Sequence, residues 1–373
     1  MQYFATVARG LEETAAEELR QLGASDVEPG FTGVSFTGDR LLLYRINLWA
    51  RIPFRILMHI HTCSCRTAKQ LYGGIQEIDW SSYFSPSETF AVRATGKNSQ
   101  LNHSHYTALQ VKNAIVDQQR QQLNERSSID TDNPDLTITV HIQENLCTVS
   151  LDSSGGSLHR RGYRPAVGLA PLKETLASAL IDMTTWTPDL AFYDPLCGSG
   201  TFPIEASLKA LNIAPGLFRE QFAFEKWRDF DAALWEQLLT DADAQQQSQL
   251  TSVIMGGDRS QDALDQARFN AYQCGVGDQI QFMQQDIADA EAPADQGILM
   301  CNPPYGERIG DTEKLGAFYK LMGDVFKQRF KGWTAYVLCG NLELAKRIGL
   351  KPARRIVAYN GSIECRLLKY DLY

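Results

Sequence analysis

The 373-residue sequence has no apolar run long enough to span a bilayer and no charged-then-apolar leader, so we expect a cytoplasmic protein without a membrane partner. It also has no Cys-x-x-Cys pair. Its eight cysteines are scattered, and the spacing of Cys63 and Cys65 is too tight for the usual zinc site. We interpret them as reduced, mostly buried thiols and expect no metal. A metal held by this pair with His59 and His61 is the less favoured alternative, since the two histidines fit one face of a strand.

A net positive charge is missing as well. The formal charge is −8, which alone argues against nucleic acid. The distribution is uneven, however, because residues 45–112 hold eight basic residues and four histidines against three acids. Charges act locally, within a screening length of about 10 Å, so a basic region on an acidic protein suits a selective nucleic-acid binder. A solvated surface without a partner would have the same composition, and composition alone leaves both readings open.

Two phosphate-binding fingerprints are missing too. Residues 194–201 read Asp-Pro-Leu-Cys-Gly-Ser-Gly-Thr, without the third glycine of a dinucleotide loop and without a following Gly-Lys-Ser/Thr. This segment follows a predicted strand at 191–193 and precedes a predicted helix at 203–211. Ligands bind at such carboxyl ends in open α/β sheets. The leading Asp194 argues against phosphate and favours a cationic or hydroxyl-bearing ligand such as S-adenosylmethionine. The alternative is a tight strand–helix turn without a ligand.

Helices and strands alternate in the C-terminal part, from about residue 169. The periodicity predicts helices at 171–183, 203–211, 260–275 and 312–330, and strands at 191–193, 253–255, 279–283, 298–301 and 333–339. Segments 355–359 and 363–370 flank Asn360-Gly361, a strong hairpin signal. Four α/β units and a terminal hairpin imply a mostly parallel sheet with one antiparallel strand. Residues 215–249 lengthen the first unit, and their polar tail is expected to be exposed.

The first 155 residues or so have a different, α+β pattern that predicts two small subdomains. Strands are expected at 2–8, 32–37, 52–61, 89–95, 136–143 and 145–151, and helices at 11–23, 39–48 and 104–123. The run Ser-Ser-Gly-Gly-Ser at 153–157 is the best candidate for a flexible linker between the two parts.

The strand at 298–301 runs directly into Asn302-Pro303-Pro304-Tyr305. This ending suits methylation of an exocyclic amine, because the Asn302 side-chain oxygen and the Pro303 carbonyl can accept from both N–H groups and favour the pyramidal, reactive nitrogen. The two prolines stiffen the loop, and Tyr305 offers a ring for the base. Asn-Pro also marks ordinary turns. Acids at three preceding strand ends, Asp194, Asp258 and Asp286, make an ordinary turn the weaker explanation.

The ordered set of the Asp-Pro-x-Cys-Gly-Ser-Gly-Thr loop, two further acids and Asn-Pro-Pro-Tyr resembles the Rossmann-type S-adenosylmethionine-dependent amino-methyltransferases. The blocks Leu-His-Arg-Arg-Gly-Tyr-Arg at 158–164 and Ala-Pro-Leu-Lys-Glu-Thr at 170–175 narrow the resemblance to the THUMP-domain RNA methyltransferases, especially the bacterial large-subunit rRNA guanine-N2 group. The resemblance implies a ferredoxin-like subdomain at 1–60, a THUMP domain at 61–155 and a Rossmann-like methyltransferase domain at 156–373. A second methyltransferase domain, fused in some relatives, is expected to be absent.

The resemblance also implies roles for individual residues. Asn302, Pro303, Pro304 and Tyr305 would form the catalytic loop. The S-adenosylmethionine site would comprise Asp194, Leu196, Gly198, Gly200, Asp258, Asp286, Pro171, Leu172 and Thr175. Here Asp258 would bind ribose and Asp286 the adenine edge. Neither Glu307 nor Arg308 is given a role. Methyl transfer would be direct, without a covalent intermediate or a metal.

RNA is the expected partner, with ribosomal RNA favoured over transfer RNA and no obligate protein partner. The candidate RNA contacts are Arg93, Lys97, His103, Lys112, Arg160, Arg161 and Arg164, although the last three would equally suit an interdomain salt-bridge cluster. Adenine-N6 methylation of DNA or RNA is the nearest alternative, because both targets are exocyclic amines that must leave the stack. Glutamine methylation in proteins and a non-catalytic RNA-binding assembly factor are further alternatives. No helix-turn-helix with a basic recognition helix is evident.

Overall fold

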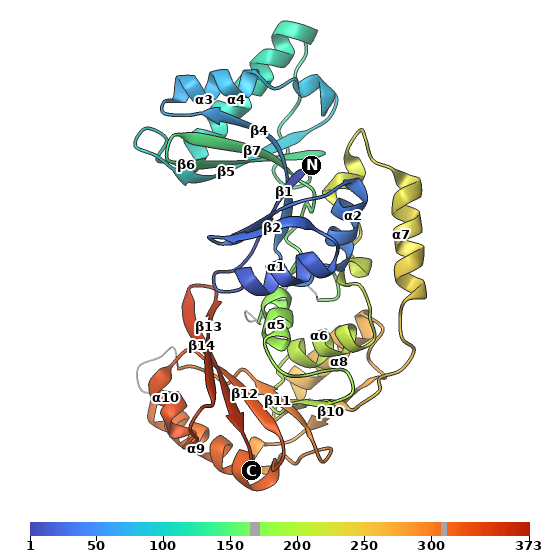
Figure 1. Ribbon diagram of the computed structural model, residues 1–373, viewed down its shortest axis with the longest axis vertical. Helices are drawn as coiled ribbons and strands as arrows, with labels where there is room; N and C mark the ends of the chain where they lie inside the picture. The colour runs from blue at the N-terminus through green and yellow to red at the C-terminus, as the bar shows by residue number, and fades with distance from the viewer. Residues whose placement is uncertain (165–171, 307–311) are drawn as a thin grey trace.

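The computed structural model describes residues 1–164, 172–306 and 312–373. The described chain forms two seven-stranded sheets, one in the N-terminal half and one in the C-terminal half. In Figure 1 the first sheet and its helices occupy the upper part of the molecule and the second sheet the lower part. The predicted fold class is therefore confirmed. Within the described residues, no helix has the length and apolar character needed to cross a membrane.

The N-terminal sheet has the strand order β2-β3-β1-β4-β7-β6-β5. Its strands are β1 (Gln2–Thr6), β2 (Ser25–Gly30), β3 (Gly33–Thr37), β4 (Arg55–Ser64), β5 (Phe90–Lys97), β6 (Leu136–Gln143) and β7 (Leu146–Asp152). Strand β4 pairs with β1 through residues 55–58 and with β7 through residues 57–64. This single long strand therefore joins the two predicted subdomains into one sheet.

Four helices cover this first sheet: α1 (Glu12–Gln21), α2 (Arg40–Trp49), α3 (Ala68–Gln76) and α4 (Ser104–Leu123). Their starts follow the capping residues in the sequence. Asp39 and Thr67 accept hydrogen bonds from the N–H groups of Leu42 and Gln70 at the starts of α2 and α3. Trp80, in a 3₁₀ turn after α3, is fully buried and donates its indole N–H to the Ile75 carbonyl.

The C-terminal sheet has the order β10-β9-β8-β11-β12-β14-β13. Its strands are β8 (Ala191–Asp194), β9 (Ile254–Asp258), β10 (Ile280–Gln284), β11 (Gly297–Cys301), β12 (Thr334–Cys339), β13 (Arg354–Asn360) and β14 (Ile363–Asp371). All neighbours from β10 to β12 pair in parallel, whereas β14 is antiparallel to both β12 and β13. The predicted single antiparallel strand is thus confirmed as β14.

The helices of this half are α5 (Glu174–Asp182), α6 (Thr201–Ala210), α7 (Ala232–Ala244), α8 (Gln261–Gln273), α9 (Thr312–Arg329) and α10 (Leu342–Arg347). Helix α7 belongs to the segment that lengthens the first α/β unit. In Figure 1 it stands beside α2, away from the second sheet. The rings of Tyr44 on α2 and Phe224 stack at 4.5 Å, and Trp235 of α7 meets Phe224 edge-on at 5.1 Å. The insertion therefore attaches the methyltransferase half to the N-terminal half.

The prediction of a flexible linker at 153–157 is wrong, because this segment is packed into the protein. Ser153 and Ser154 are fully buried, and their hydroxyls exchange hydrogen bonds of 2.9 and 2.7 Å with the Asn47 amide. The Arg219 guanidinium donates to the carbonyls of Ser154 and Gly156. The small serine and glycine residues allow close packing here, and their hydroxyl and carbonyl groups form hydrogen bonds. Composition alone therefore gave the wrong interpretation.

Candidate functional site

Three predicted polar residues meet at one edge of the second sheet. Asp194 ends β8, Asp258 ends β9 and Asn302 follows β11, and β8 lies between the other two strands. Asp286 comes two residues after β10, on the far side of β9. Because these strands are parallel, their carboxyl ends share an edge, which is where open α/β sheets bind ligands. The structure brings the four strand-end residues together along neighbouring strands.

The glycine loop after β8 is fixed by the carboxylate of Asp258. The Gly198 N–H donates to Asp258 Oδ2 at 3.0 Å, and the Ser260 N–H donates to Oδ1 at 2.9 Å. Each oxygen keeps a lone pair for a ligand. Both Gly198 and Gly200 have positive φ, +51° and +82°. A Cβ on Gly198 would meet nothing within 4 Å, so the backbone is open on that side to an approaching group.

Asp194 is 2% exposed, and Oδ1 accepts one hydrogen bond of 3.0 Å, from the Leu196 N–H. Burial raises the pKa of Asp194 well above its usual range, and nearby Asp258 adds to the rise. No basic side chain of the described chain contributes to holding the charged form. The site thus contains a buried carboxylate without a cation, an arrangement suited to a positively charged ligand.

Helix α5 packs against α6, the helix that follows the glycine loop. Thr175 is fully buried, Leu172 is 7% exposed and Pro171 lies outside the described residues. Arg164 connects the start of α5 to the start of α6, with an ion pair of 3.1 Å to Glu174 and a hydrogen bond of 2.6 Å to the Thr201 hydroxyl. By contrast, Asp286 is exposed and caps a 3₁₀ turn through the Ala288 N–H. One of its oxygens makes no hydrogen bond within the described chain.

The loop after β11 places Asn302 and Pro303 at the sheet edge and exposes Pro304. The Tyr319 hydroxyl donates to the Pro304 carbonyl at 3.2 Å, which anchors the loop to α9. Tyr305 is half-buried, and its hydroxyl donates to Asn302 Oδ1. Its ring lies so close to Gly340 that a Cβ there would be 2.8 Å from it. Tyr305 is thus packed against the protein and bonded to the acceptor that we assigned to the target amine. Glu307 and Arg308 lie outside the described residues.

The three arginines after the linker differ in position. Arg160 is exposed, whereas Arg161 is 2% exposed and Arg164 is half-buried. The Arg161 guanidinium donates to the Arg51 carbonyl at 2.6 Å and pairs with Glu205 at 3.4 Å. These contacts match the salt-bridge alternative for Arg161 and Arg164, whose charges are already paired inside the protein. Only Arg160 remains free to contact phosphate.

Sequence reasoning missed Glu205. This buried carboxylate on α6 accepts from Arg161, Tyr163 and Ser178 and so joins three segments. The available signal was a single acid in the otherwise uncharged stretch 201–208, all eight residues of which are buried in the structure. An unpaired charge is seldom fully buried, so a basic partner could have been expected there.

The RNA candidates of the first sheet are also divided. Lys97 and His103 are exposed and Lys112 is half-buried. Arg93 pairs with the buried Asp152 at 3.3 Å. Asp152 also pairs with Arg55. The charge of Arg93 is therefore paired within the sheet. The side chains of Lys97, His103 and Lys112 remain accessible.

Family profiles match nearly the whole chain. The profile described as the RMKL-like methyltransferase domain matches residues 161–369. The THUMP domain matches residues 65–152, and the RlmL ferredoxin-like domain matches residues 2–57. The chain belongs to the RMKL-like methyltransferase family. The resemblance, the fold class and the enzyme class predicted from the sequence are thereby confirmed. The exact domain limits stay a prediction.

Similar proteins agree with this assignment. A Synechocystis protein named as an RNA methyltransferase, slr0064, is 57% identical over 371 residues, which cover 100% of this chain and 97% of the relative. The ribosomal RNA large subunit methyltransferase K/L of Syntrophotalea carbinolica is 40% identical over 383 residues, covering 100% of this chain and 54% of the relative. The chain therefore spans about half the length of the K/L proteins that it matches.

Two solved structures have the same fold along the chain. SMU.472, a methyltransferase complexed with SAH, has a TM-score of 0.91 and 32% identity and covers 100% of this chain and 98% of its own. A Listeria monocytogenes protein described as a predicted N6-adenine-specific DNA methylase has a TM-score of 0.89 and 33% identity, with 100% and 96% covered. SAH is the product that S-adenosylmethionine leaves after methyl transfer, and the structure that holds it has the same fold as this chain. The predicted cofactor is thereby confirmed.

Proposed function

We propose that this chain transfers a methyl group from S-adenosylmethionine to the exocyclic N2 amine of a guanosine in RNA. The observation that carries the proposal is the position of Asn302, at the end of β11, beside the glycine loop that follows β8. A hydrogen-bond acceptor for an amine thus stands next to a site suited to a cationic methyl donor. The N-terminal THUMP domain supplies the means to hold RNA.

The residues present fit S-adenosylmethionine. Asp194 is a buried carboxylate without a cation, and the α-ammonium group of the cofactor would supply one. The open side of Gly198 admits the methionine portion, and the free lone pairs of Asp258 can accept from ribose hydroxyls. Leu196 and Gly200 belong to the same loop. Bound there, the cofactor supplies an activated methyl group for direct displacement.

The target base would be held by the loop after β11. Asn302 Oδ1 and the Pro303 carbonyl would accept from the two N–H groups of the amine and favour its pyramidal form. No donor of the described chain bonds to the Pro303 carbonyl, while Asn302 Oδ1 is bonded to Tyr305. One of the two lone pairs of Asn302 Oδ1 is thus already engaged, so the target amine competes with the Tyr305 hydroxyl for this oxygen. After transfer the amine is positively charged and strongly acidic, so its proton can leave to water.

The names of the similar K/L proteins favour large-subunit ribosomal RNA as the substrate of this chain. Accessible basic groups at β5 and α4, namely Lys97, Lys112 and His103, together with Arg160, would contact its phosphates. Folded RNA is read by its shape and its loops, and a guanosine must leave its stack before it can reach Asn302. A ribosomal substrate would place the protein in the cytoplasm, as the sequence predicts.

The test is transfer of labelled methyl groups from S-adenosylmethionine to ribosomal RNA, transfer RNA and duplex DNA from cells that lack the gene, followed by nucleoside analysis. N2-methylguanosine in ribosomal RNA is the expected product. Asn302→Ala serves as the matched inactive variant: we expect it to lower the rate by about 10²–10³-fold with RNA affinity unchanged. N6-methyladenine in DNA would contradict the proposal. Cofactor binding without transfer to any RNA would favour the non-catalytic alternative.

A further inference from the structure

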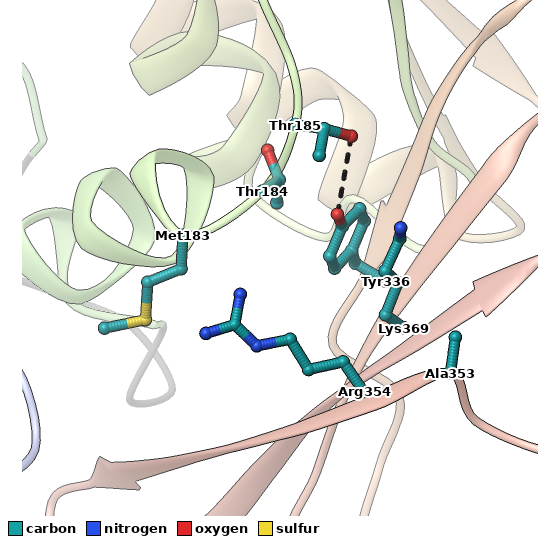
Figure 2. Close-up of a pocket in the computed structure, with 7 residues that line it drawn as sticks. All are labelled: Met183, Thr184, Thr185, Tyr336, Ala353, Arg354 and Lys369. Atoms are coloured by element: carbon teal, nitrogen blue, oxygen red, sulfur yellow. Dashed lines mark hydrogen bonds between the residues drawn. The ribbon is translucent and has the colours of Figure 1, made fainter.

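We propose that a pocket on the face of the second sheet next to α5 holds a phosphate group of the RNA backbone, an inference that rests on the proposed function. The pocket has a volume of about 330 Å³ and lies between the end of α5 and the strands β12, β14 and β13. Figure 2 shows its lining residues, including Thr184, Thr185, Tyr336, Arg354 and Lys369. All five carry a hydrogen-bond donor, and two carry a positive charge.

The strand register places the two cations side by side. Lys369 of β14 is the direct partner of both Tyr336 on β12 and Arg354 on β13. Direct partners project from the same face of a sheet, so the three side chains form one row across three strands. Like charges placed directly opposite each other destabilise an antiparallel pair. An anion between Arg354 and Lys369 would remove that cost.

The pairing of these cations inside the protein is incomplete. Lys369 is 3.2 Å from Asp371 on its own strand, so one carboxylate partly balances it. Within the described chain, Arg354 forms no ion pair or side-chain hydrogen bond, and it is exposed. In Figure 2 its guanidinium points across the pocket toward Met183 and Thr184. Arg354 is therefore free to bind an oxyanion with two parallel N–H groups.

Two hydroxyls, one from the sheet and one from the segment after α5, add neutral donors. Thr185 Oγ1 and the Tyr336 hydroxyl are 3.5 Å apart, a long contact that either group can give up for a ligand. Thr184 already donates to the Ile181 carbonyl at 2.7 Å and forms part of the wall only. The pocket volume is about ten times the share of one water, ≈30 Å³. It thus has room for a phosphate and the atoms attached to it.

The position of the pocket suits the backbone of the substrate. Tyr336 lies three residues before the end of β12, which is about 10 Å along the strand from the catalytic edge. Residues 341–373 hold seven basic residues against three acids, although the whole chain is acidic. Figure 1 shows the β13–β14 hairpin reaching toward α1, and Arg9 lies over the Tyr359 ring at 4.9 Å. The C-terminal segment that lines the pocket is thus locally basic and touches the N-terminal half.

The test compares Arg354→Gln with Arg355→Gln. Both residues are exposed on β13, but Arg355 is partnered with Leu368 and faces the other side of the sheet. Arg355→Gln therefore removes the same charge as Arg354→Gln without changing the pocket. Inorganic phosphate at constant ionic strength should raise the Tm of the wild type and of Arg355→Gln, and leave that of Arg354→Gln unchanged. The slope of log affinity for ribosomal RNA against log salt should become shallower by about 0.7–0.9 in Arg354→Gln and stay unchanged in Arg355→Gln. Lys369→Gln should behave as Arg354→Gln does.

Equal salt slopes for the two arginine variants would overturn the proposal, even if phosphate binds, because the pocket would then take a free phosphate compound. An absent phosphate effect in the wild type would also overturn it, leaving the two cations to interact with the carboxyl end of α5 alone. These outcomes are separable from failure of the proposed function. If no RNA accepts a methyl group but the difference in salt slope persists, the pocket stands and the enzymatic assignment falls.

Discussion

The hydroxyl of Tyr305 donates a hydrogen bond to Oδ1 of Asn302, the oxygen that we propose accepts the target amine. The Tyr305 ring is half-buried against Gly340 and, like Ile363, packs against the main hydrophobic core. Burial raises the pKa of the Tyr305 phenol, so the hydroxyl stays protonated and remains a donor. Without the base, the loop thus occupies part of its own catalytic acceptor, and the base competes with this bond for the oxygen.

Tyr305→Phe should therefore favour substrate binding. The ring and its packing are kept, while the competing hydrogen bond, worth about 0.5–1.5 kcal/mol, is removed. We expect KM for RNA to fall by about 2–10-fold, with kcat unchanged. Steady-state methyl transfer measures both. A rise in KM together with a fall in kcat would mean that the hydroxyl itself contacts the base, and would contradict a merely competing bond.

Replacing Asp194 should reveal what its buried charge costs. Because burial raises the pKa of Asp194 in the folded state, the folded protein binds this proton more tightly than the unfolded chain does. Its contribution to stability is then lost as the pH rises from about 4 toward the folded-state pKa. Asp194→Asn keeps an acceptor for the Leu196 N–H and removes the charge. We expect the variant to be more stable by about 1–3 kcal/mol at pH 8, and by less at pH 5, as measured by urea unfolding.

The same substitution should weaken the binding of S-adenosylmethionine by at least about tenfold, since the ammonium group loses its counter-charge. Calorimetric titration measures this directly. Gln285, which also lies near the sheet edge and bonds to Tyr193, offers a control, because Gln285→Ala leaves Asp194 and its charge in place. Tight binding by Asp194→Asn would remove this carboxylate from the cofactor site.

Arg161 and Arg160 are adjacent in sequence, but their replacement should change the stability of the protein by very different amounts. Arg161→Ala leaves Glu205 buried without its cation and should cost about 3–5 kcal/mol in the free energy of unfolding. Arg160→Ala removes an exposed side chain and should change it by less than about 0.5 kcal/mol. Urea unfolding of both variants measures the difference. Equal stability would show that Tyr163 and Ser178 alone satisfy Glu205.

The strand ends of the second sheet could be predicted because their polar residues follow short apolar runs. Asp194, Asp258 and Asn302 lie at the carboxyl ends of parallel strands, as predicted. Asn360-Gly361 forms the turn of the terminal hairpin. The local sequence carries this information directly. The long strand β4 was predicted as well, but its pairing with both β1 and β7 depends on contacts between distant segments.

Several elements could not be predicted from local pattern. Strand β2 reads Ser-Asp-Val-Glu-Pro-Gly, which is poor in β-forming residues, and it forms because an edge strand tolerates proline and pairs with β3 alone. Helix α7 was not predicted, because the polar tail of its segment suggested an exposed stretch without a helix. Asp231, which caps the start of α7, was the available signal. Arg161 was predicted to meet RNA because sequence shows charge and not burial. Its partner Glu205 lies 44 residues away.

Charge reversal on the first sheet should separate RNA binding from catalysis. Lys97 is exposed at the end of β5 and Lys112 is half-buried on α4. If both contact phosphates, the pair of substitutions Lys97→Glu and Lys112→Glu removes two counterion-releasing contacts. The salt slope of log affinity should then become shallower by about 1.4–1.8. Filter binding of ribosomal RNA between 50 and 200 mM salt, concentrations at which such contacts are resolved, measures it.

Lys331→Glu is a control for charge reversal at a distant site, because this exposed lysine precedes β12 at the opposite end of the second sheet from Asn302. It should leave the slope unchanged, apart from the small general effect of net charge. At saturating RNA the kcat of the double variant should equal that of the wild type, since neither lysine lies at the catalytic edge. A double variant with the wild-type slope would remove β5 and α4 from the RNA surface. RNA would then be held by the other accessible groups, Arg160 and the Arg354–Lys369 pocket among them.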